Sequence, residues 1–236
     1  LSEQSDPAPF YEKLADRTLA LLEVPIEGRR ILDLGSGPGA YTAALERAGA
    51  NVVAVDMNGD DIAQVVGNGL PGITADGTRL PFPDASFDGV FSSNLVEHVP
   101  DAGALFDEIQ RVLKVGGWAW VSWTNWYSPW GGHFITPLHY LGPKLGYRMH
   151  VKFRGEPPRN RVFDGLWPAH IGPTIRAVEQ RPGLRIRSAV PRYYPSQRWI
   201  MRVPGFRELA SWNCLLTIDR VDEMAVDRAS LGRSGV

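Results

Sequence analysis

The first half of the chain alternates short apolar runs with segments of helical periodicity. Strand-length apolar runs occur at 29–34, 51–56, 70–75, 89–93 and 118–123, and helical spacing of apolar residues occurs between them at 40–48, 60–66 and 102–114. A further helix over 7–22, starting at Asp6-Pro7, is expected to flank the domain and pack on it. Because strands that alternate with helices pair in parallel, the pattern predicts a doubly wound parallel α/β sheet.

After the fifth predicted strand, the alternation of strand-length and helical segments stops. Residues 125–183 are rich in proline, glycine and aromatic side chains, which predicts a cap or binding element with helices at 137–146 and 171–181. Two more strands are predicted at 184–190 and 213–221, the last one antiparallel to its neighbour, and the polar tail from Asp222 is expected to fray. The pattern therefore predicts one domain over 1–236, with the cap at 125–183 inserted in it.

Composition limits the class of protein. The chain has 236 residues, a net charge of −1 and a pI of about 6.6, which argues against a nucleic-acid partner. Its one cysteine, Cys214, excludes an internal disulfide and fits the reducing cytoplasm. No apolar run approaches the ~20 residues of a membrane span, and no signal pattern follows Leu1, which need not be the native start. We expect a cytoplasmic monomer or homodimer that acts on a small molecule.

A glycine-rich turn follows the first predicted strand. Gly35, Gly37 and Gly39 occupy alternate positions before the helix at 40–48. Glycine lets the backbone bend sharply and approach a ligand closely, and the N-terminus of the helix offers unpaired N–H groups. The looser dinucleotide fingerprint also matches, because Ala40 stands in its third place. The turn alone therefore predicts a cofactor containing adenosine without deciding which one.

Polar residues close the strands that follow. Asp33, Asp56, Asp76 and Asn94 fall at predicted carboxyl strand ends, where such sheets bind ligands. Asp56 stands 21 residues after Gly35, which suits a carboxylate that accepts hydrogen bonds from ribose hydroxyls; a helix-capping role is the alternative. Asp76 can accept from an adenine amine.

These motifs, in this order, resemble the class I S-adenosylmethionine-dependent methyltransferases of the methyltransferase type 11 kind. The matching segments are Ile31–Tyr41, Asp56, Asp76-Gly77, Leu80–Asp88, Ser92–Val99 and Leu113–Gly117. The resemblance implies a Rossmann-like sheet of seven strands with the last antiparallel. It also implies S-adenosylmethionine as cofactor and S-adenosylhomocysteine as product.

The resemblance also implies roles for the residues that match. Asp33 and the three glycines would flank the methionine part of the cofactor, and Asp56 would bind the ribose with Met57 beside it. Asp76 and Gly77 would face adenine. Asn94 would lie beside the methyl group that is transferred.

Three segments of the second half resemble actinobacterial O-methyltransferases of glycans and glycolipids, such as those of mycobacterial methylmannose polysaccharide. They are Gly131-Gly132-His133, His139-Tyr140-Leu141-Gly142 and Arg192-Tyr193-Tyr194-Pro195. This resemblance implies a sugar or oligosaccharide hydroxyl as acceptor, with a non-sugar natural product or a lipid as the alternative. The rival functions are a nicotinamide-dependent oxidoreductase and a catalytically silent module that binds S-adenosylmethionine.

A hydroxyl acceptor must lose its proton to a base or to a metal that lowers its pKa. His133, His139 and Glu97 are the catalytic candidates, because histidine titrates near neutral pH and all three lie at predicted strand ends or in the cap. In some family members an acid–histidine pair after the fourth strand helps to hold Mg²⁺, which would make Glu97 and His98 metal ligands. The alternative is that Glu97 binds the amino group of the cofactor while His98 packs.

Aromatic and basic residues of the second half each admit two interpretations. Trp126, Tyr127, Trp130 and Tyr193 are candidates to line the acceptor pocket, because aromatic rings stack on sugars, but such rings also form cores. The basic residues between Lys144 and Arg161 can form a solvated face, or can meet an anionic substrate or a membrane surface.

Overall fold

One seven-stranded sheet forms the centre of the molecule. The computed structural model describes residues 7–158 and 161–223. The strands are β1 (Arg30–Leu34), β2 (Asn51–Asp56), β3 (Gly72–Thr74), β4 (Phe87–Ser93), β5 (Leu113–Thr124), β8 (Leu184–Pro191) and β9 (Asn213–Arg220), in the order β3-β2-β1-β4-β5-β9-β8. β9 runs antiparallel to both of its neighbours, β5 and β8, while the other strand pairs are parallel, so the predicted sheet is confirmed, including the direction of its last strand.

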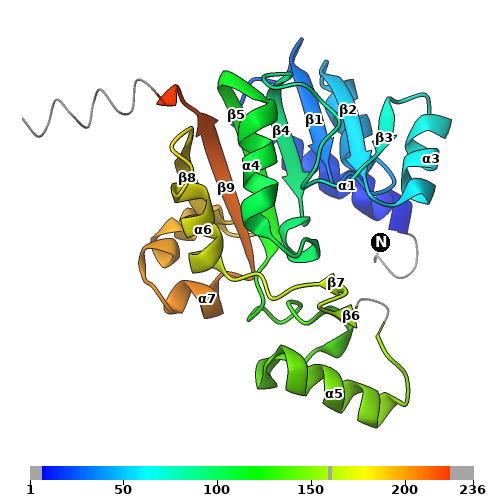
Figure 1. Cartoon of the computed structure of the whole chain (residues 1–236), viewed down its shortest axis with the longest axis vertical. Coiled ribbons are helices and arrows are strands. Elements are labelled where there is room, and N and C mark those ends of the chain that lie inside the picture. Colours follow the sequence, from blue (N-terminus) through cyan, green and yellow to red (C-terminus); the bar gives the residue numbers. More distant parts are fainter. Residues whose placement is uncertain (1–6, 159–160, 224–236) are drawn as a thin grey trace, which may run out of the picture.

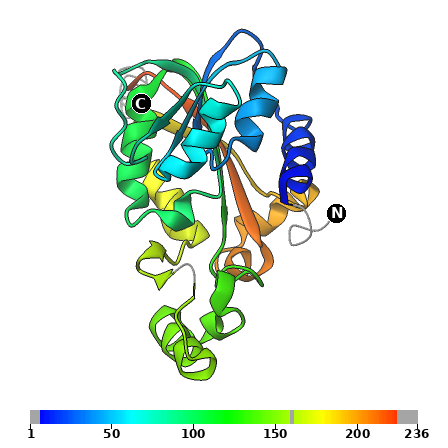
Figure 2. The same ribbon diagram turned by 90° about the vertical axis from the view of Figure 1, so that its right-hand side faces the viewer.

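Helices cover both faces of the sheet (Figure 2). The helices α1 (Pro7–Leu19), α2 (Ala40–Arg47) and α3 (Gly59–Gly67) lie on one face, and α4 (Ala102–Val112) and α6 (Ile171–Glu179) lie on the other. The alternation of β1 explains this division. Ile31 packs with Leu45 of α2, whereas Leu32 and Leu34 join the core formed with α4 and α6.

The strand register brings the polar strand ends together. In β1, Asp33 pairs with Ala54 of β2 and with Phe91 of β4, so these three parallel strands end at one edge of the sheet. This is the edge where ligands bind in doubly wound sheets.

Residues 125–170, which we call the cap, extend beyond this edge (Figure 1). The cap contains the 3₁₀ turns η2 (His133–Ile135) and η3 (Leu138–Leu141), helix α5 (Pro143–Arg154) and the short strands β6 (Arg161–Val162) and β7 (Gly165–Leu166). Its own small core contains Trp126, Ile135, Val162 and Leu166. Helix α6, which falls inside the predicted insertion 125–183, packs instead on α4 beside the sheet.

Several predicted boundaries differ from those of the structure. The helix expected at 137–146 is split, because Gly142 has a φ of +90°, and α5 then continues to Gly155, whose φ is +78°. Helix α1 ends at Leu19 rather than at 22, and β3 is shorter than predicted. β5 begins at Leu113, which pairs with Phe87, and a bulge separates this pair from the next one, Gly89 with Trp118. The predicted helix start at Asp6 and most of the polar tail lie outside the described residues.

Two further elements, η4 (Pro195–Arg202) and α7 (Phe206–Ala210), connect β8 to β9. Among the residues described, no helix is long and apolar enough to cross a membrane.

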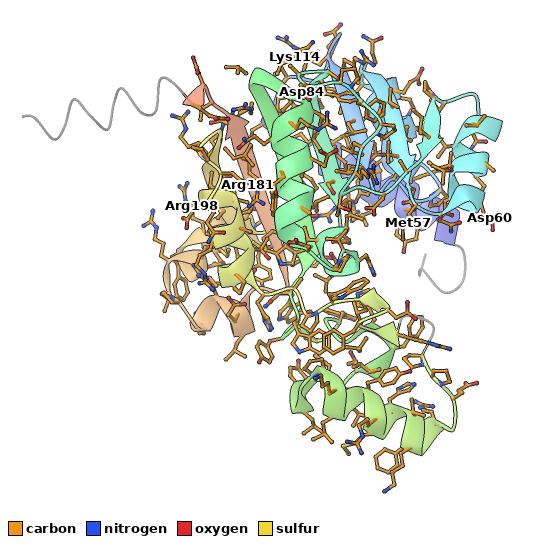
Figure 3. The ribbon with its side chains drawn as sticks, in the orientation of Figure 1. Met57, Asp60, Asp84, Lys114, Arg181 and Arg198 are labelled. Carbon is orange, nitrogen blue, oxygen red and sulfur yellow. The ribbon has the colours of Figure 1, made fainter. Side chains whose placement is uncertain are left out.

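Arg111 holds the long loop between β3 and β4. Its guanidinium donates to the carbonyl oxygens of Leu80 and Phe82 and to the carboxylates of Asp84 and Glu108. This contact lowers the pKa of Glu108 below its usual value. Figure 3 shows Asp84 at the edge of the sheet opposite Met57, so the motif around Asp84 serves the fold at a distance from the polar strand ends.

Candidate functional site

The three glycines of the turn differ in the space beside their Cα atoms, and only one of them has room for a side chain. A Cβ added at Gly39 would lie 2.8 Å from Cγ2 of Val65, and one added at Gly35 would lie 3.0 Å from Cβ of Leu95. A Cβ at Gly37 would meet no described atom within 4 Å. All three glycines have positive φ, which other residues rarely adopt. Gly35 and Gly39 therefore let the turn pack, and Gly37 leaves the space where a ligand can approach the backbone.

Asp56, at the end of β2, holds this turn. Its Oδ2 accepts from the backbone N–H of Gly37 at 2.9 Å, and its Oδ1 accepts from that of Asn58 at 2.9 Å. Because a carboxylate offers about four lone-pair sites, it can still accept hydrogen bonds from two ribose hydroxyls. The neighbouring Met57 is 74% exposed, and Figure 3 shows it beside α3.

Asp33 lies inside the sheet edge rather than on its surface. Its side chain is buried, and its Oδ2 accepts from the hydroxyl of Thr42 at 2.6 Å. Burial raises the pKa of Asp33 to about 7, and the nearby charge of Asp56 adds to this effect. In the absence of ligand, Asp33 therefore carries its proton through much of the acidic range.

The predicted adenine side contains Asp76 and Gly77. Asp76 is exposed, and its Oδ1 accepts from the backbone N–H and the hydroxyl of Thr78, both at 2.8 Å. A Cβ at Gly77 would lie 3.3 to 3.5 Å from side-chain atoms of Leu34, Leu105 and Leu95. This pair therefore forms a tight turn over an apolar floor, which suits a flat ring.

Asn94 ends β4 in a left-handed conformation, with a φ of +59°. Its backbone N–H donates to the carbonyl oxygen of Ser122 at 2.8 Å, and its Oδ1 accepts from Nδ2 of Asn213 at 2.8 Å. Asparagine tolerates this conformation better than most residues. Asn213 comes from β9, so sequence reasoning did not connect the two residues.

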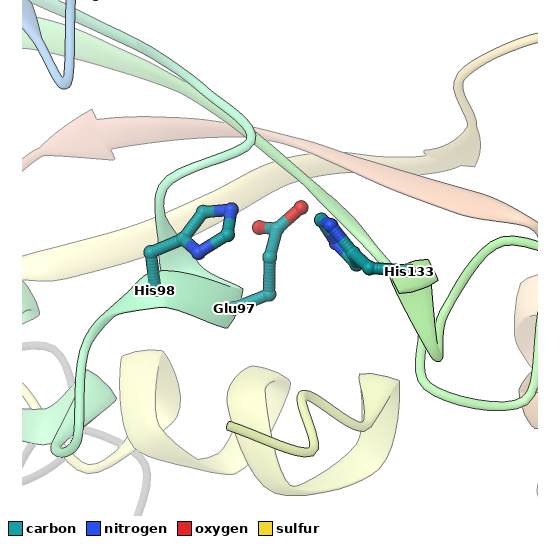
Figure 4. Close-up of side chains that lie close together, drawn as sticks. All are labelled: Glu97, His98 and His133. Carbon is teal, nitrogen blue, oxygen red and sulfur yellow. The ribbon is translucent and has the colours of Figure 1, made fainter. Parts of the chain in front are cut away.

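The structure brings together Glu97, His98 and His133 (Figure 4). One ligand atom from each of the three side chains lies within 4.8 Å of the others. Glu97 and His98 come from η1 (Val96–His98) after β4, and His133 comes from η2 in the cap. Leu95, which contacts Gly35, precedes them directly, so the cluster lies next to the glycine turn.

Glu97 is buried, and within the described part of the chain one of its two carboxylate oxygens accepts no hydrogen bond. Its Oε1 accepts from the backbone N–H of Thr124 at 2.9 Å, while Oε2 has no hydrogen-bond partner among the described residues. Burial raises the pKa of Glu97 above its usual value, against the opposing attraction of His98. A buried polar atom without a partner is costly, so Oε2 marks a place where a ligand atom or an ion would be stabilised.

The chain orients the ring of His98 and fixes the backbone of His133. Nδ1 of His98 donates to the carbonyl oxygen of Gly165 in β7 at 2.7 Å, which leaves the lone pair on Nε2. His133 has a φ of +47°, and its backbone N–H donates to the carbonyl oxygen of Trp130. Burial lowers the pKa of His133 to about 4, and the charge of His98 adds to this. The His133 ring is therefore neutral near pH 7.

The other predicted cap residues occupy different environments. His139 is fully buried, with Nε2 3.0 Å from the carbonyl oxygen of Ser128, and Trp126 is buried in the core of the cap. Both side chains therefore pack inside the cap, and Nδ1 of His139 has no hydrogen-bond partner among the described residues. Tyr127, Trp130 and Tyr193 are exposed and remain candidates to line the pocket.

Sequence reasoning assigned no role to Arg192. Its guanidinium donates to the hydroxyls of Ser93, Ser122, Tyr41 and Thr18, and lies 5.0 Å from the centroid of the Trp120 ring. It therefore ties the end of β8 to β4, β5, α1 and α2. In the sequence, Arg192 was noted only as the first residue of the segment Arg192-Tyr193-Tyr194-Pro195, at the end of a predicted strand.

Comparison with known proteins finds methyltransferases that match most of the length of this chain. A family model described as a methyltransferase domain matches residues 32–121. An uncharacterized methyltransferase of Mycobacterium sp. (strain KMS) is 38% identical over 92% of this chain and 89% of its own length. One of Mycobacterium tuberculosis (strain H37Rv) is 35% identical over the same shares.

Solved structures show the same fold. An S-adenosylmethionine-dependent methyltransferase from Mesorhizobium loti aligns over 89% of this chain and 98% of its own, with 22% identity and a TM-score of 0.61. A geranyl diphosphate C-methyltransferase from Streptomyces coelicolor A3(2), in complex with Mg²⁺, geranyl diphosphate and S-adenosyl-L-homocysteine, aligns over 89% of this chain and 78% of its own, with 17% identity and a TM-score of 0.60.

Proposed function

Because this chain belongs to the class I S-adenosylmethionine-dependent methyltransferases, we propose that it transfers the methyl group to a hydroxyl of a sugar or oligosaccharide. The observation that carries this proposal is the cluster of Glu97, His98 and His133 beside the glycine turn. A hydroxyl is a poor nucleophile until its proton leaves, whereas the sulfonium of the cofactor already supplies a good leaving group. A set of proton-accepting side chains at this place therefore suits an oxygen acceptor.

The chain contributes binding and orientation on the cofactor side. Asp56 accepts hydrogen bonds from the ribose, and the open backbone at Gly37 contacts the methionine part. Asp76 and Gly77 hold adenine, and Asn94, fixed by Asn213, lies beside the methyl group. Fixing both reactants in line for displacement is the main contribution that the protein makes to such a transfer.

Exposed aromatic rings support a sugar acceptor. Trp130 packs edge-on against Trp212 with ring centroids 5.0 Å apart, and the backbone of Trp130 is hydrogen-bonded to that of His133. Tyr127 and Tyr193 are also exposed. A ring held open to solvent next to the cluster, as that of Trp130 is, can stack on the apolar face of a sugar ring.

The proposal is tested by supplying isotopically labelled S-adenosylmethionine with a panel of monosaccharides, oligosaccharides and lipid-linked sugars. We expect S-adenosylhomocysteine to form together with a product whose new methyl group is shown by NMR to be a methoxy group. A methyl group on carbon or nitrogen would contradict the proposal. Cofactor binding without turnover of any acceptor would favour a silent module.

The cluster also fits a divalent cation. Oε2 of Glu97, which has no partner among the described residues, and Nε2 of His98 both lie near the His133 ring. His133 therefore adds a third candidate metal ligand, from the cap, to Glu97 and His98. Such a cation would lower the pKa of a hydroxyl bound to it. Two imidazoles and one carboxylate suit a first-row transition metal better than Mg²⁺, which prefers oxygen ligands.

We therefore expect a chelator to lower turnover, and Mn²⁺, Co²⁺ or Zn²⁺ to restore it better than Mg²⁺ does. The measurement is S-adenosylhomocysteine release after dialysis, with metal content determined on the same samples. Full turnover by metal-free protein would contradict the cation site and leave His133 to accept the proton directly.

A further inference from the structure

We propose that the outer face of the cap, formed by α5 and the turn before it, binds an anionic lipid surface. Charge is the first observation. The sequence from 125 to 155 contains no Asp or Glu, although the chain as a whole carries a net charge of −1. Lys144, Arg148, Lys152 and Arg154 are all exposed, and among the residues described none of them forms an ion pair.

Three of these cations form one stripe. Lys144, Arg148 and Lys152 recur every four residues of α5, so they lie one above another on the same side of the helix. Like charges at this spacing destabilise a helix, unless an anionic partner compensates for them. The opposite side of α5 packs on the cap, because a Cβ at Gly146 would lie 2.4 Å from the carbonyl oxygen of Leu138. The stripe therefore lies on the side of α5 away from η3, and α5 itself is at the outer end of the molecule in Figure 1.

Large apolar side chains of η2, η3 and α5 are also exposed to water. They are Phe134, Tyr140, Leu141, Leu145 and Phe153, with exposed fractions from 49% to 68%. Leu145 shares the side of α5 that carries the stripe, whereas Phe153, two turns after Gly146, lies on the side of that glycine near the end of the helix. Single exposed apolar residues are ordinary, but their mixture with unpaired cations on one helix is typical of segments that bind at a membrane interface.

A hollow beside α5 has the same character. It has a volume of about 470 Å³ and is lined by Tyr147, Val151 and Pro157 together with Arg148, Lys152 and Arg161. The three cations of this hollow suit the phosphate group of a lipid, and its apolar walls suit the first part of an acyl chain. A nucleic acid would also pair with the cations, but it would leave Leu141 and Leu145 exposed to water.

Docking through the cap would involve the candidate site. Helix α5 packs on η2, which carries His133. A membrane that contacts α5 would therefore be close to the cluster, and the acceptor would be a hydroxyl of a lipid-linked molecule. This consequence rests on the proposed function, whereas the docking itself does not.

The test is co-sedimentation of the whole protein with vesicles. We expect binding to vesicles of phosphatidylcholine with phosphatidylglycerol, much weaker binding to phosphatidylcholine alone, and release as salt is raised. The variant Lys144→Gln/Arg148→Gln/Lys152→Gln should bind the anionic vesicles about 100-fold more weakly, since each basic side chain near an anionic surface contributes severalfold. The variant Leu141→Ser/Leu145→Ser, which keeps every charge, should also bind more weakly.

The matched control is Arg29→Gln/Arg198→Gln/Arg202→Gln, which removes three exposed cations outside the cap. Figure 3 shows Arg198 at the left of the view, in η4 and separate from α5 at the bottom. All variants should bind S-adenosylhomocysteine like the wild type, which shows that they are folded. Equal vesicle binding by the cap and control variants, absence of binding to anionic vesicles, or preference for an oligonucleotide over vesicles would each overturn the docking. None of these outcomes depends on the acceptor, so failure of the proposed function would be seen separately.

Discussion

Replacing His133 with alanine is expected to lower turnover by about 100- to 10,000-fold and to leave S-adenosylhomocysteine affinity unchanged. His133 comes from the cap, while the cofactor side is built from the ends of β1, β2 and β4. The alanine variant removes the imidazole that lies against Glu97 and His98. The loss follows whether that imidazole accepts the proton itself or holds a cation that acidifies the hydroxyl.

The measurement compares the rate of S-adenosylhomocysteine release at saturating acceptor with the affinity determined by calorimetry. His150→Ala is the matched control, because it removes another cap histidine that is not in the cluster and should turn over at nearly the wild-type rate. Normal turnover of His133→Ala would remove His133 from the mechanism. Loss of cofactor affinity together with turnover would indicate a damaged fold instead.

Replacing Asp56 with alanine is expected to weaken S-adenosylhomocysteine binding by about 10- to 100-fold, as the loss of hydrogen bonds to a charged acceptor does. Two effects act in the same direction. The ribose hydroxyls lose their acceptor, and the N–H of Gly37 loses the carboxylate that orders the turn. Once the cofactor is saturating, turnover should return to a large part of its wild-type value.

Calorimetric titration with S-adenosylhomocysteine checks this prediction, and thermal unfolding without ligand reports any loss of stability. Asp60→Ala is the control, since Asp60 is an exposed acid four residues further along, which Figure 3 shows near Met57. Wild-type affinity of Asp56→Ala would refute its role at the ribose. An equal loss in both variants would indicate a general effect of charge.

The sheet and the cofactor side could be predicted because their signals are local. A buried parallel strand such as 51–56 is apolar on both faces, and its closing acid follows within the same run. The antiparallel direction of β9 was implied by the resemblance to the methyltransferase family, and the place of Asp56 beside Gly37 follows from the convergence of carboxyl strand ends in a doubly wound sheet. The roles of the three glycines could not be separated in this way. Only the packing of Val65 and Leu95 distinguishes Gly39 and Gly35 from the open position at Gly37.

The cap could not be predicted in detail, because residues of one type serve opposite purposes there. Trp126 and Trp130 are four residues apart and chemically identical, yet one is buried in the core of the cap and the other is 59% exposed. His139 and His133 differ in the same way. Burial is decided by contacts with β6, β7 and η3, which are distant in sequence, and no periodic pattern in 125–170 records those contacts.

By itself, the sequence determined the α/β sheet, the cofactor edge and the acids that close its strands. The reason is that strand, turn and helix signals are carried by neighbouring residues. Only the tertiary structure placed His133 beside Glu97 and His98, and only it turned the cations of 144–152 into an outward stripe next to exposed leucines. Both features depend on how the cap folds back on the sheet edge. That arrangement is set by packing between segments far apart in the chain, which local patterns do not encode.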